Sequence, residues 1–291
     1  MNWGRWRIPL MIGPTLLVLV VLFYGSLGYG LLQSFGYQPG IGKFDFTLSA
    51  YINILTKAEY ARYFWPGLAL TLWISLVSTF ISLVCAIAGA SLLRNTFIGK
   101  RLVNFIFQLS LPVPHIVSAI GIMLLLSQSG LFARIAAAMN LIDMPSQFPA
   151  LVNDPWGIGI MAAYIWKEIP FFGIIILAVL QTSADDYEAA AQVLGANRWQ
   201  CFYHVTLPMI TPAVLSSSVI VFAFTFGTFE VPKLLGARYP AMLPVLTLEF
   251  FQDPDLNSRA EGMAMSMIIA LLIIILIMVY TRLLFKQKKA R

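Results

Sequence analysis

Six long apolar stretches, separated by shorter polar segments, dominate the pattern of residues along this chain. A helix rises about 1.5 Å per residue, so about 20 apolar residues cross the roughly 30 Å hydrocarbon core of a bilayer. The pattern therefore predicts an all-α polytopic membrane protein with about six transmembrane helices. The predicted spans are residues 8–33, 66–93, 103–126, 156–181, 209–235 and 263–284.

The composition agrees with a membrane protein. Of the 291 residues, 59% are hydrophobic and only 11% are charged, whereas average soluble chains carry about 25% charged residues. The net charge is +6, but the basic residues lie beside apolar spans, so we interpret them as orienting the chain in lipid and expect no nucleic-acid partner. The first apolar stretch is too long for the core of a signal peptide and is expected to stay attached.

The basic residues are distributed unevenly between the two sides of the predicted bundle. If both termini share one side, that side holds eleven basic residues in short segments and the opposite side holds seven. The positive-inside rule then places both termini and the link 182–208 in the cytoplasm, an N-in/C-in topology. The eleven residues are Arg5, Arg7, Arg94, Lys100, Arg101, Arg198, Arg282, Lys286, Lys288, Lys289 and Arg291.

The polar link 182–208, between the fourth and fifth spans, has the pattern of two helices joined by a glycine. Asp185 and Asp186 favour a helix N-terminus, and the alanine-rich run 188–194 has high helix propensity. Gly195 is placed to end that helix in a left-handed conformation.

The second half of the link predicts another short helix. Asn197 can cap its N-terminus, and Trp199, Phe202 and Tyr203 give it an apolar stripe. Pro208 is expected to end it before the fifth span. The link therefore predicts a hairpin against the membrane with a surface available to a partner.

The residues of this link resemble the EAA loop of the permease subunits of binding-protein-dependent ABC importers. A Glu-Ala-Ala run is followed by Gly195, nine residues, Val205, one residue, and Leu207-Pro208. In the family the Glu stands six positions before the Gly; here it stands seven before, a rotation of about 100° on a helix, so that Ala189 occupies the usual position. The resemblance covers roughly residues 65–285. The matched residues, expected to couple to an ATPase, are Glu188, Ala189, Ala190, Ala191, Gly195, Ala196, Val205, Leu207 and Pro208.

This resemblance implies a type I importer permease, in the bacterial inner membrane, that moves a small polar solute. It implies a first helix with an external segment in 1–65, a five-helix core in 66–285 and a basic tail in 286–291. The implied partners are two cytoplasmic ATPase subunits, a second permease that is identical or a sister chain, and an extracytoplasmic solute-binding protein. ATP and Mg would bind to the ATPase, and this chain would hold no cofactor.

Polar and helix-breaking residues inside three of the spans mark a candidate translocation pathway. Two prolines two residues apart must interrupt the third span, and freed carbonyls are tolerated in a membrane only beside protein or a wet cavity. An adjacent Lys-Glu pair interrupts the fourth span; ionisable groups there suggest function, and neighbours on a helix point about 100° apart. The candidates are Pro112, Pro114, His115, Ser118, Lys167, Glu168, Thr225, Thr228 and Glu230.

Structural alternatives for these residues stay open at this point. His115 can be a hydrogen-bonded interior histidine, Glu230 can pair with Lys233 one turn later, and Lys167 or Glu168 can form a salt bridge to a neighbouring span. The hydroxyl residues of the second span are interpreted as helix packing.

Spans three and five also resemble permeases of the polyamine, ferric-ion, thiamine and phosphonate group. An acidic pathway would suit a cation such as a polyamine, although two lysines accompany the acids.

Missing motifs narrow the functional class. The sequence has no Gly-x-x-x-x-Gly-Lys-Ser/Thr phosphate loop, so ATP hydrolysis is expected on a separate chain. Metalloprotease, esterase and Cys/His metal-binding patterns are also missing, so we predict a transport subunit and not an enzyme. A self-sufficient secondary transporter or channel is the alternative, and a membrane scaffold is a weaker one. The hairpin separates them, because an importer subunit needs it and a channel does not.

Overall fold

The computed structural model describes residues 3–94 and 97–289, with side chains described except in 3–10, 182–185 and 283–289. The predicted basic tail and the Asp185 side chain fall outside the described side chains. The structure is 79% helical, and the described residues form no strands. Six described helices are long and apolar enough to span a membrane, which confirms the predicted fold class. They are Met11–Ser34, Ala58–Arg94, His115–Ala138, Ile158–Gln181, Arg198–Gly227 and Leu256–Arg282.

The chain divides into two compact units. Unit 1 comprises residues 1–65 and 246–271, and unit 2 comprises 66–245 and 272–291. Within unit 1, the Asn53 amide donates to Glu261 at 2.9 Å, and the hydroxyls of Ser34 and Tyr51 lie 2.8 Å apart. The helices of unit 1 are α1 (Trp3–Val18), a π-helical turn (Leu19–Tyr24), α2 (Gly25–Ser34), α3 (Ser49–Thr56), most of α12 (Leu243–Gln252) and part of α13 (Arg259–Lys289).

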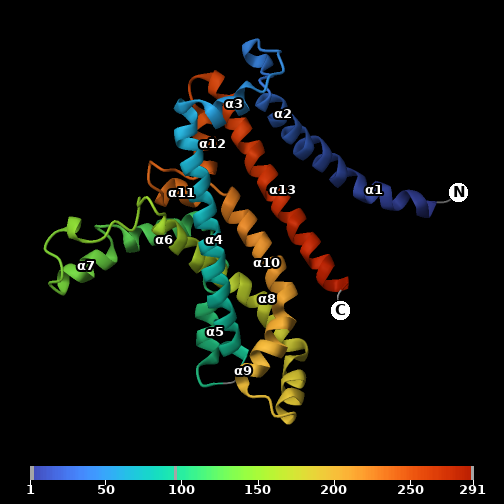
Figure 1. The fold of residues 1–291 in the computed structure, drawn as a ribbon, viewed down its shortest axis with the longest axis vertical. Coiled ribbons are helices and arrows are strands. Elements are labelled where there is room, and N and C mark those ends of the chain that lie inside the picture. The colour runs from blue at the N-terminus through green and yellow to red at the C-terminus, as the bar shows by residue number, and fades with distance from the viewer. Residues whose placement is uncertain (1–2, 95–96, 290–291) are drawn as a thin grey trace. The chain divides into compact units, whose positions relative to one another are not determined.

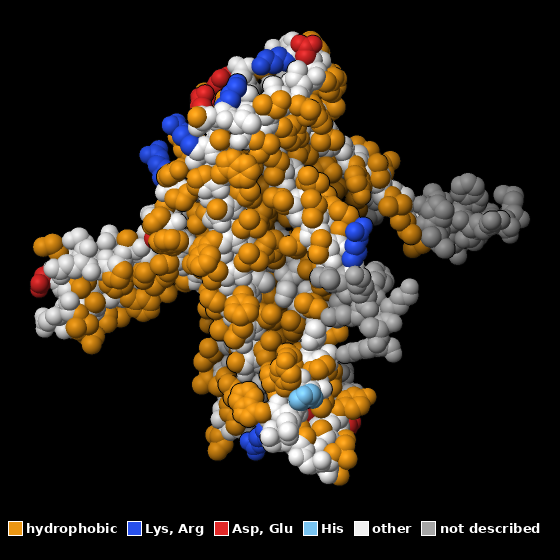
Figure 2. Space-filling model, viewed as in Figure 1, with side chains coloured by type: hydrophobic (Ala, Val, Ile, Leu, Met, Phe, Trp, Pro, Cys, Tyr) orange, Lys and Arg blue, Asp and Glu red, His pale blue; other side chains and the backbone are white. Residues whose placement is uncertain are grey.

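Unit 2 is the larger of the two, and its helices can be followed in Figure 1. Its helices are most of α4 (Ala58–Arg94), α5 (Lys100–Gln108), α6 (His115–Leu126), α7 (Leu131–Ala138), α8 (Ile158–Val193), α9 (Arg198–Cys201), α10 (Leu207–Gly227), α11 (Glu230–Leu235) and the end of α13. Hydrophobic side chains cover most of the visible surface of the long helices, as a lipid-facing surface requires (Figure 2).

Two buried apolar clusters hold α4 against α8. In the first, Leu70 and Ile74 of α4 pack with Ile160 and Tyr164 of α8. In the second, Ala86 and Ala90 of α4 pack with Phe172, Ile176 and Leu180 of α8. The two helices therefore run side by side in the same direction, with a middle segment between the clusters.

The third span is broken at its two prolines, as the sequence predicts, so residues 103–126 do not form one helix. The chain forms α5, then six non-helical residues, and α6 begins at His115. Pro112 and Pro114 lie in the break because a proline ring has no N–H and clashes with the preceding turn. The Lys167 ammonium of α8 lies against the break and donates to the carbonyls of Ser110 and Val113, both at 2.6 Å.

The link between spans four and five also differs from the prediction. Helix α8 runs without interruption from Ile158 to Val193, so Asp186 lies inside a helix and marks no new N-terminus. Pro208 does not end a helix either: it lies in the first turn of α10, after a π-helical turn over Phe202–Thr206. The wider turn accommodates the proline because its missing N–H and its ring disturb a normal α-turn.

The fifth span ends earlier than predicted. Helix α10 stops at Gly227, and a separate helix α11 starts at Glu230. The chain is therefore interrupted after Gly227, and Pro232 lies inside the new short helix.

We expect Lys167→Met to destabilise the protein, because it leaves the carbonyls of Ser110 and Val113 buried without a donor. A lost hydrogen bond of this type costs about 1–3 kcal/mol. Thermal unfolding in detergent should show the loss, and Lys57→Met, the same change at an exposed lysine, should leave the midpoint near that of the wild type. Equal midpoints for the two variants would show that Lys167 does not support the break.

Candidate functional site

The link between α8 and α9 is a tight helical hairpin that turns at Gly195. This residue has a φ of +90°, in the left-handed region that favours glycine. Its N–H donates to the Gln192 carbonyl at 2.9 Å, and the N–H of Ala196 donates to the Ala191 carbonyl at 3.0 Å. These two bonds form the C-terminal capping pattern in which a left-handed residue ends a helix, as the sequence predicts.

The start of α9 is fixed by a reciprocal cap. The Gln200 N–H donates to the Asn197 side chain at 2.9 Å, and the Asn197 N–H donates to the Gln200 side chain at 2.8 Å. The predicted cap at Asn197 is confirmed, and the partner Gln200 completes a capping box. The hairpin is therefore fixed on both sides of Gly195.

Glu188 ties the hairpin to the end of α4. Its carboxylate accepts two hydrogen bonds from the Arg94 guanidinium, at 2.7 and 2.9 Å, and a third from the Thr206 hydroxyl. The hydrogen bonds from Arg94 lower the pKa of Glu188 from its ordinary value of 4.5; burial opposes this effect, and Thr206 adds to it. A two-pronged arginine pair fixes orientation as well as distance. The end of α4, the first arm of the hairpin and the π-helical turn before α10 thus meet at one carboxylate.

The one-residue shift of this Glu has a structural consequence. Glu188 is turned inward to α4, and the half-buried carboxylate is only 18% exposed. Ala189, which occupies the position of the family's Glu, is exposed. Ala190 is also exposed, and Ala191 and Ala196 are half-buried. Val205, Leu207 and Pro208 are half-buried in the π turn and the first turn of α10.

The tip of the hairpin presents large apolar side chains to its surroundings. Val193 and Leu194 are 87% and 89% exposed, and Trp199 is 80% exposed. Tyr203, one turn further, is also exposed. Apolar groups gathered at the end of a polar link form a surface suited to protein contact.

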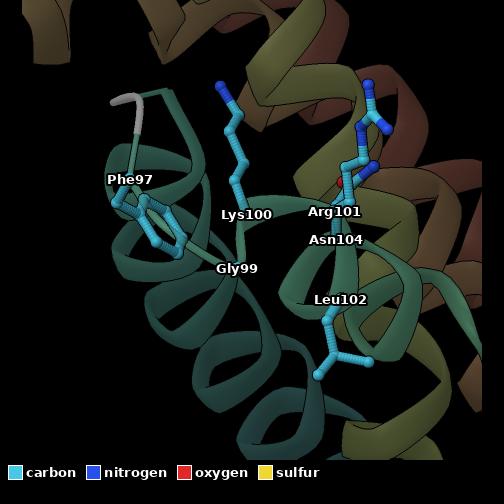
Figure 3. Close-up of a pocket in the computed structure, with 6 residues that line it drawn as sticks. All are labelled: Phe97, Gly99, Lys100, Arg101, Leu102 and Asn104. Carbon is cyan, nitrogen blue, oxygen red and sulfur yellow. The ribbon is translucent and has the colours of Figure 1, made fainter.

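A basic return between α4 and α5 lies at the same end of unit 2, because Arg94 at the end of α4 bonds the hairpin. A cavity of about 650 Å³ opens there. Figure 3 shows Lys100 and Arg101 extending from the start of α5 and Phe97 on the opposite wall. The return is therefore basic, as expected for a cytoplasmic segment.

Inside the span region, the structure brings His115 and Glu168 together. The His115 Nε2 lies 3.5 Å from the Glu168 carboxylate, and the imidazole packs on Phe224 with ring centroids 4.6 Å apart. Glu168 is 7% exposed, whereas the His115 side chain is 28% exposed. Lys167 points to the break in the third span, as the divergence of adjacent helical residues predicts.

Other candidate pathway residues bond within their own helices. Ser118 donates to the Pro114 carbonyl, Thr225 to the Val221 carbonyl and Thr228 to the Phe224 carbonyl. Glu230 is exposed at the start of α11. The structure thus gathers part of the predicted pathway set, around His115 and Glu168.

Sequence reasoning missed three residues that matter here. Arg94 was assigned only to the charge count, and Thr206 received no role, although both bond Glu188. Tyr164 was also missed; it is fully buried, and its hydroxyl has no hydrogen-bond partner among the described residues. Its position four residues before Glu168, on the same helix face, was the available signal.

We expect Glu188→Gln to destabilise the protein by roughly 1–2 kcal/mol at pH 7, because the amide cannot form the ion pair with Arg94. The folded state lowers the pKa of Glu188, so the ionised carboxyl stabilises the fold above its ordinary value of 4.5. This contribution is lost as the pH falls through the lower folded-state pKa. The thermal unfolding midpoints of the wild type and the variant should therefore become equal in acid.

The matched control for this experiment is Asp186→Asn, which removes an exposed charge two residues earlier on α8. Its thermal unfolding midpoint should match that of the wild type at every pH. If the difference in unfolding midpoint between Glu188→Gln and the wild type persists unchanged in acid, the ionised carboxyl is not the source of the stabilisation.

Comparison with known proteins gives a consistent result. Residues 81–289 match the family described as "Binding-protein-dependent transport system inner membrane component". The trehalose transport permease SugA of Mycobacterium tuberculosis is 30% identical over 79% of this chain and 71% of SugA. The sulfate transport permease CysT of Escherichia coli is 26% identical over 80% of this chain and 84% of CysT.

A solved structure has the same fold. A chain of a bacterial alginate ABC transporter, crystallised with an alginate pentasaccharide-bound periplasmic protein, superposes with a TM-score of 0.78 at 18% identity, covering 96% of this chain and 94% of that chain. The interpretation as a self-sufficient channel or secondary transporter does not fit these relatives. The chain belongs to the family of inner-membrane permease components of binding-protein-dependent ABC importers.

Proposed function

We propose that this permease is driven by a separate ATPase that docks on the hairpin tip around Gly195. The exposed apolar side chains of Val193, Leu194 and Trp199 carry this proposal. Apolar side chains that project from a polar link lose water contact only when a partner covers them. The sequence has no phosphate loop, so the chain needs a partner to use ATP.

The proposed assembly contains two cytoplasmic ATPase subunits that hold ATP and Mg. A second permease, identical or a sister chain, supplies the other wall of the pathway, and an extracytoplasmic binding protein delivers the solute. Membership of the family supports both kinds of soluble partner. We place the chain in a bacterial inner membrane.

The contacts of Glu188 explain how docking would act on the spans. A force on the tip reaches α8 directly, because the first arm of the hairpin is the end of that helix. It also reaches α4 through the Arg94 pair and α10 through Thr206. Motion of the ATPases would therefore shift three helices together, as rigid-body switching requires.

We expect Gly195→Val to leave the protein folded but to abolish solute-stimulated ATP hydrolysis. An added Cβ would meet no atom within 4 Å, so the cost is local backbone strain at a φ of +90°. That strain is about 1–2 kcal/mol and is relieved when the hairpin changes shape. The measurements are co-purification of the ATPase and ATP turnover in proteoliposomes that contain the complete transporter.

Gly195→Asn is the matched control, because asparagine tolerates the left-handed conformation better than valine does. It should couple nearly as well as the wild type. The docking proposal fails if Gly195→Val retains full coupling. It also fails if the chain alone, without ATPase and ATP, gives solute flux in liposomes.

The proposed orientation places the hairpin in the cytoplasm with both termini. Cysteines introduced at Ala196 and Asp253 should therefore differ in their reaction with an impermeant thiol reagent added to whole cells. The cysteine at 253 should be labelled from outside, and the one at 196 should react only after the membrane is permeabilised. Labelling of position 196 in intact cells would contradict the proposed topology.

A further inference from the structure

A layer of polar side chains lies between the two apolar clusters that join α4 to α8. On α4, four hydroxyl residues follow one face at helical spacing, between Ile74 of the first cluster and Ala86 of the second. On α8, Glu168 lies between Tyr164 of the first cluster and Phe172 of the second. We define the polar layer as Ser75, Ser78, Thr79, Ser82, Tyr164, Glu168 and His115.

The hydroxyl groups of this layer are buried without partners. Ser75, Ser78 and Ser82 are 0% exposed, and Thr79 is 8% exposed. Within the part of the chain that the structure describes, none of these four hydroxyls has a hydrogen-bond partner, and the Tyr164 hydroxyl has none either. Serine and threonine in helices can bond their own carbonyls, as Thr71 does one turn earlier. Buried groups left unpaired cost about 1–3 kcal/mol each, so such a row calls for a ligand or water.

Glu168 is the charged member of the layer and is poorly compensated. Its neighbour Lys167 has three N–H donors, and these are directed to the carbonyls of Ser110, Leu111 and Val113. Within the part of the chain that the structure describes, the Glu168 carboxylate has one side-chain partner at hydrogen-bond distance, His115 at 3.5 Å. A carboxylate in the middle of a span is costly unless a cation or water accompanies it.

Tyr164 packs in one cluster with Val231 of α11, the residue after Glu230. The His115 side chain is 28% exposed, lies against Glu168 and packs on the Phe224 ring at an interplanar angle of 45°. Negative charge, acceptor oxygens and an aromatic ring thus converge.

We propose that the polar layer is an intramembrane binding site for an ammonium group of the transported solute, with Glu168 as its charge partner. An ammonium group offers three N–H donors, which match one carboxylate and the acceptor oxygens of neighbouring hydroxyls. An oxyanion would meet the Glu168 charge in a region of low dielectric and be repelled. This inference rests on the proposed transport function and names the solute class for it.

The test uses the complete transporter purified in detergent without the soluble binding protein. Equilibrium dialysis measures the binding of radiolabelled 1,4-diaminobutane, trehalose and sulfate. The wild type should bind the diamine at least about tenfold more tightly than the sugar or the anion. Glu168→Gln keeps the shape of the side chain and removes its charge, and it should weaken diamine binding at least about tenfold.

Two further variants keep the test decisive. Asp143→Asn removes an exposed carboxylate from the loop after α7 and should change diamine affinity by less than about twofold. Tyr164→Phe removes one unpaired hydroxyl without a change of charge and should weaken binding by about two- to fivefold, even if the Glu168 variant folds poorly. Preferred binding of trehalose or sulfate, or unchanged diamine binding in both layer variants, overturns the proposal. ATP-dependent uptake that persists in that case leaves the proposed function intact.

Discussion

A bilayer offers no water to backbone amides and carbonyls, and the folding of this chain depends on meeting that constraint. Helices α4 and α8 meet it by running unbroken for 37 and 36 residues. The third span cannot, because two prolines interrupt it, and a lysine from α8 supplies the missing donors. The charge of Lys167 is tolerated there because carbonyl dipoles surround it. A residue that looks functional by its charge therefore has a structural role, whereas the carboxylate of its neighbour Glu168 lies 3.5 Å from His115.

The irregular turns of unit 2 also allow contacts between side chains of separate segments. The π-helical turn over Phe202–Thr206 accommodates Pro208 and places the buried Thr206 hydroxyl on Glu188. The interruption after Gly227 frees α11 to pack on α6 and α8. Deviations from regular helix thus lie where side chains from separate segments must meet, at the hairpin and beside the polar layer.

The sequence predicts the parts of this structure that local rules control. The number of spans follows from hydrophobic length, and the turn at Gly195 and the cap at Asn197 follow from local backbone chemistry. The helix boundaries at the link do not follow from local rules. Helix α8 continues to Val193, and this continuation places Glu188 against Arg94 of α4 and Thr206, two contacts that the local pattern at Asp185 and Asp186 does not contain. The Arg94–Glu188 pair joins residues that are 94 positions apart in the sequence, and local sequence patterns cannot predict such a contact.

Helix α8 connects the two regions that the chain uses differently. Glu168, in the polar layer, and Glu188, in the hairpin, are 20 residues apart on one helix, a separation of about 30 Å along its axis. The two carboxylates lie on one continuous helix, so a displacement of the hairpin reaches the layer through α8 without a relay through loops. Pro170 lies between them and removes one backbone hydrogen bond, which makes that turn the place where α8 bends most easily. Since Glu168 lies two residues from this turn, bending there would change its distance from His115 on α6, and with it the access of a solute to the layer.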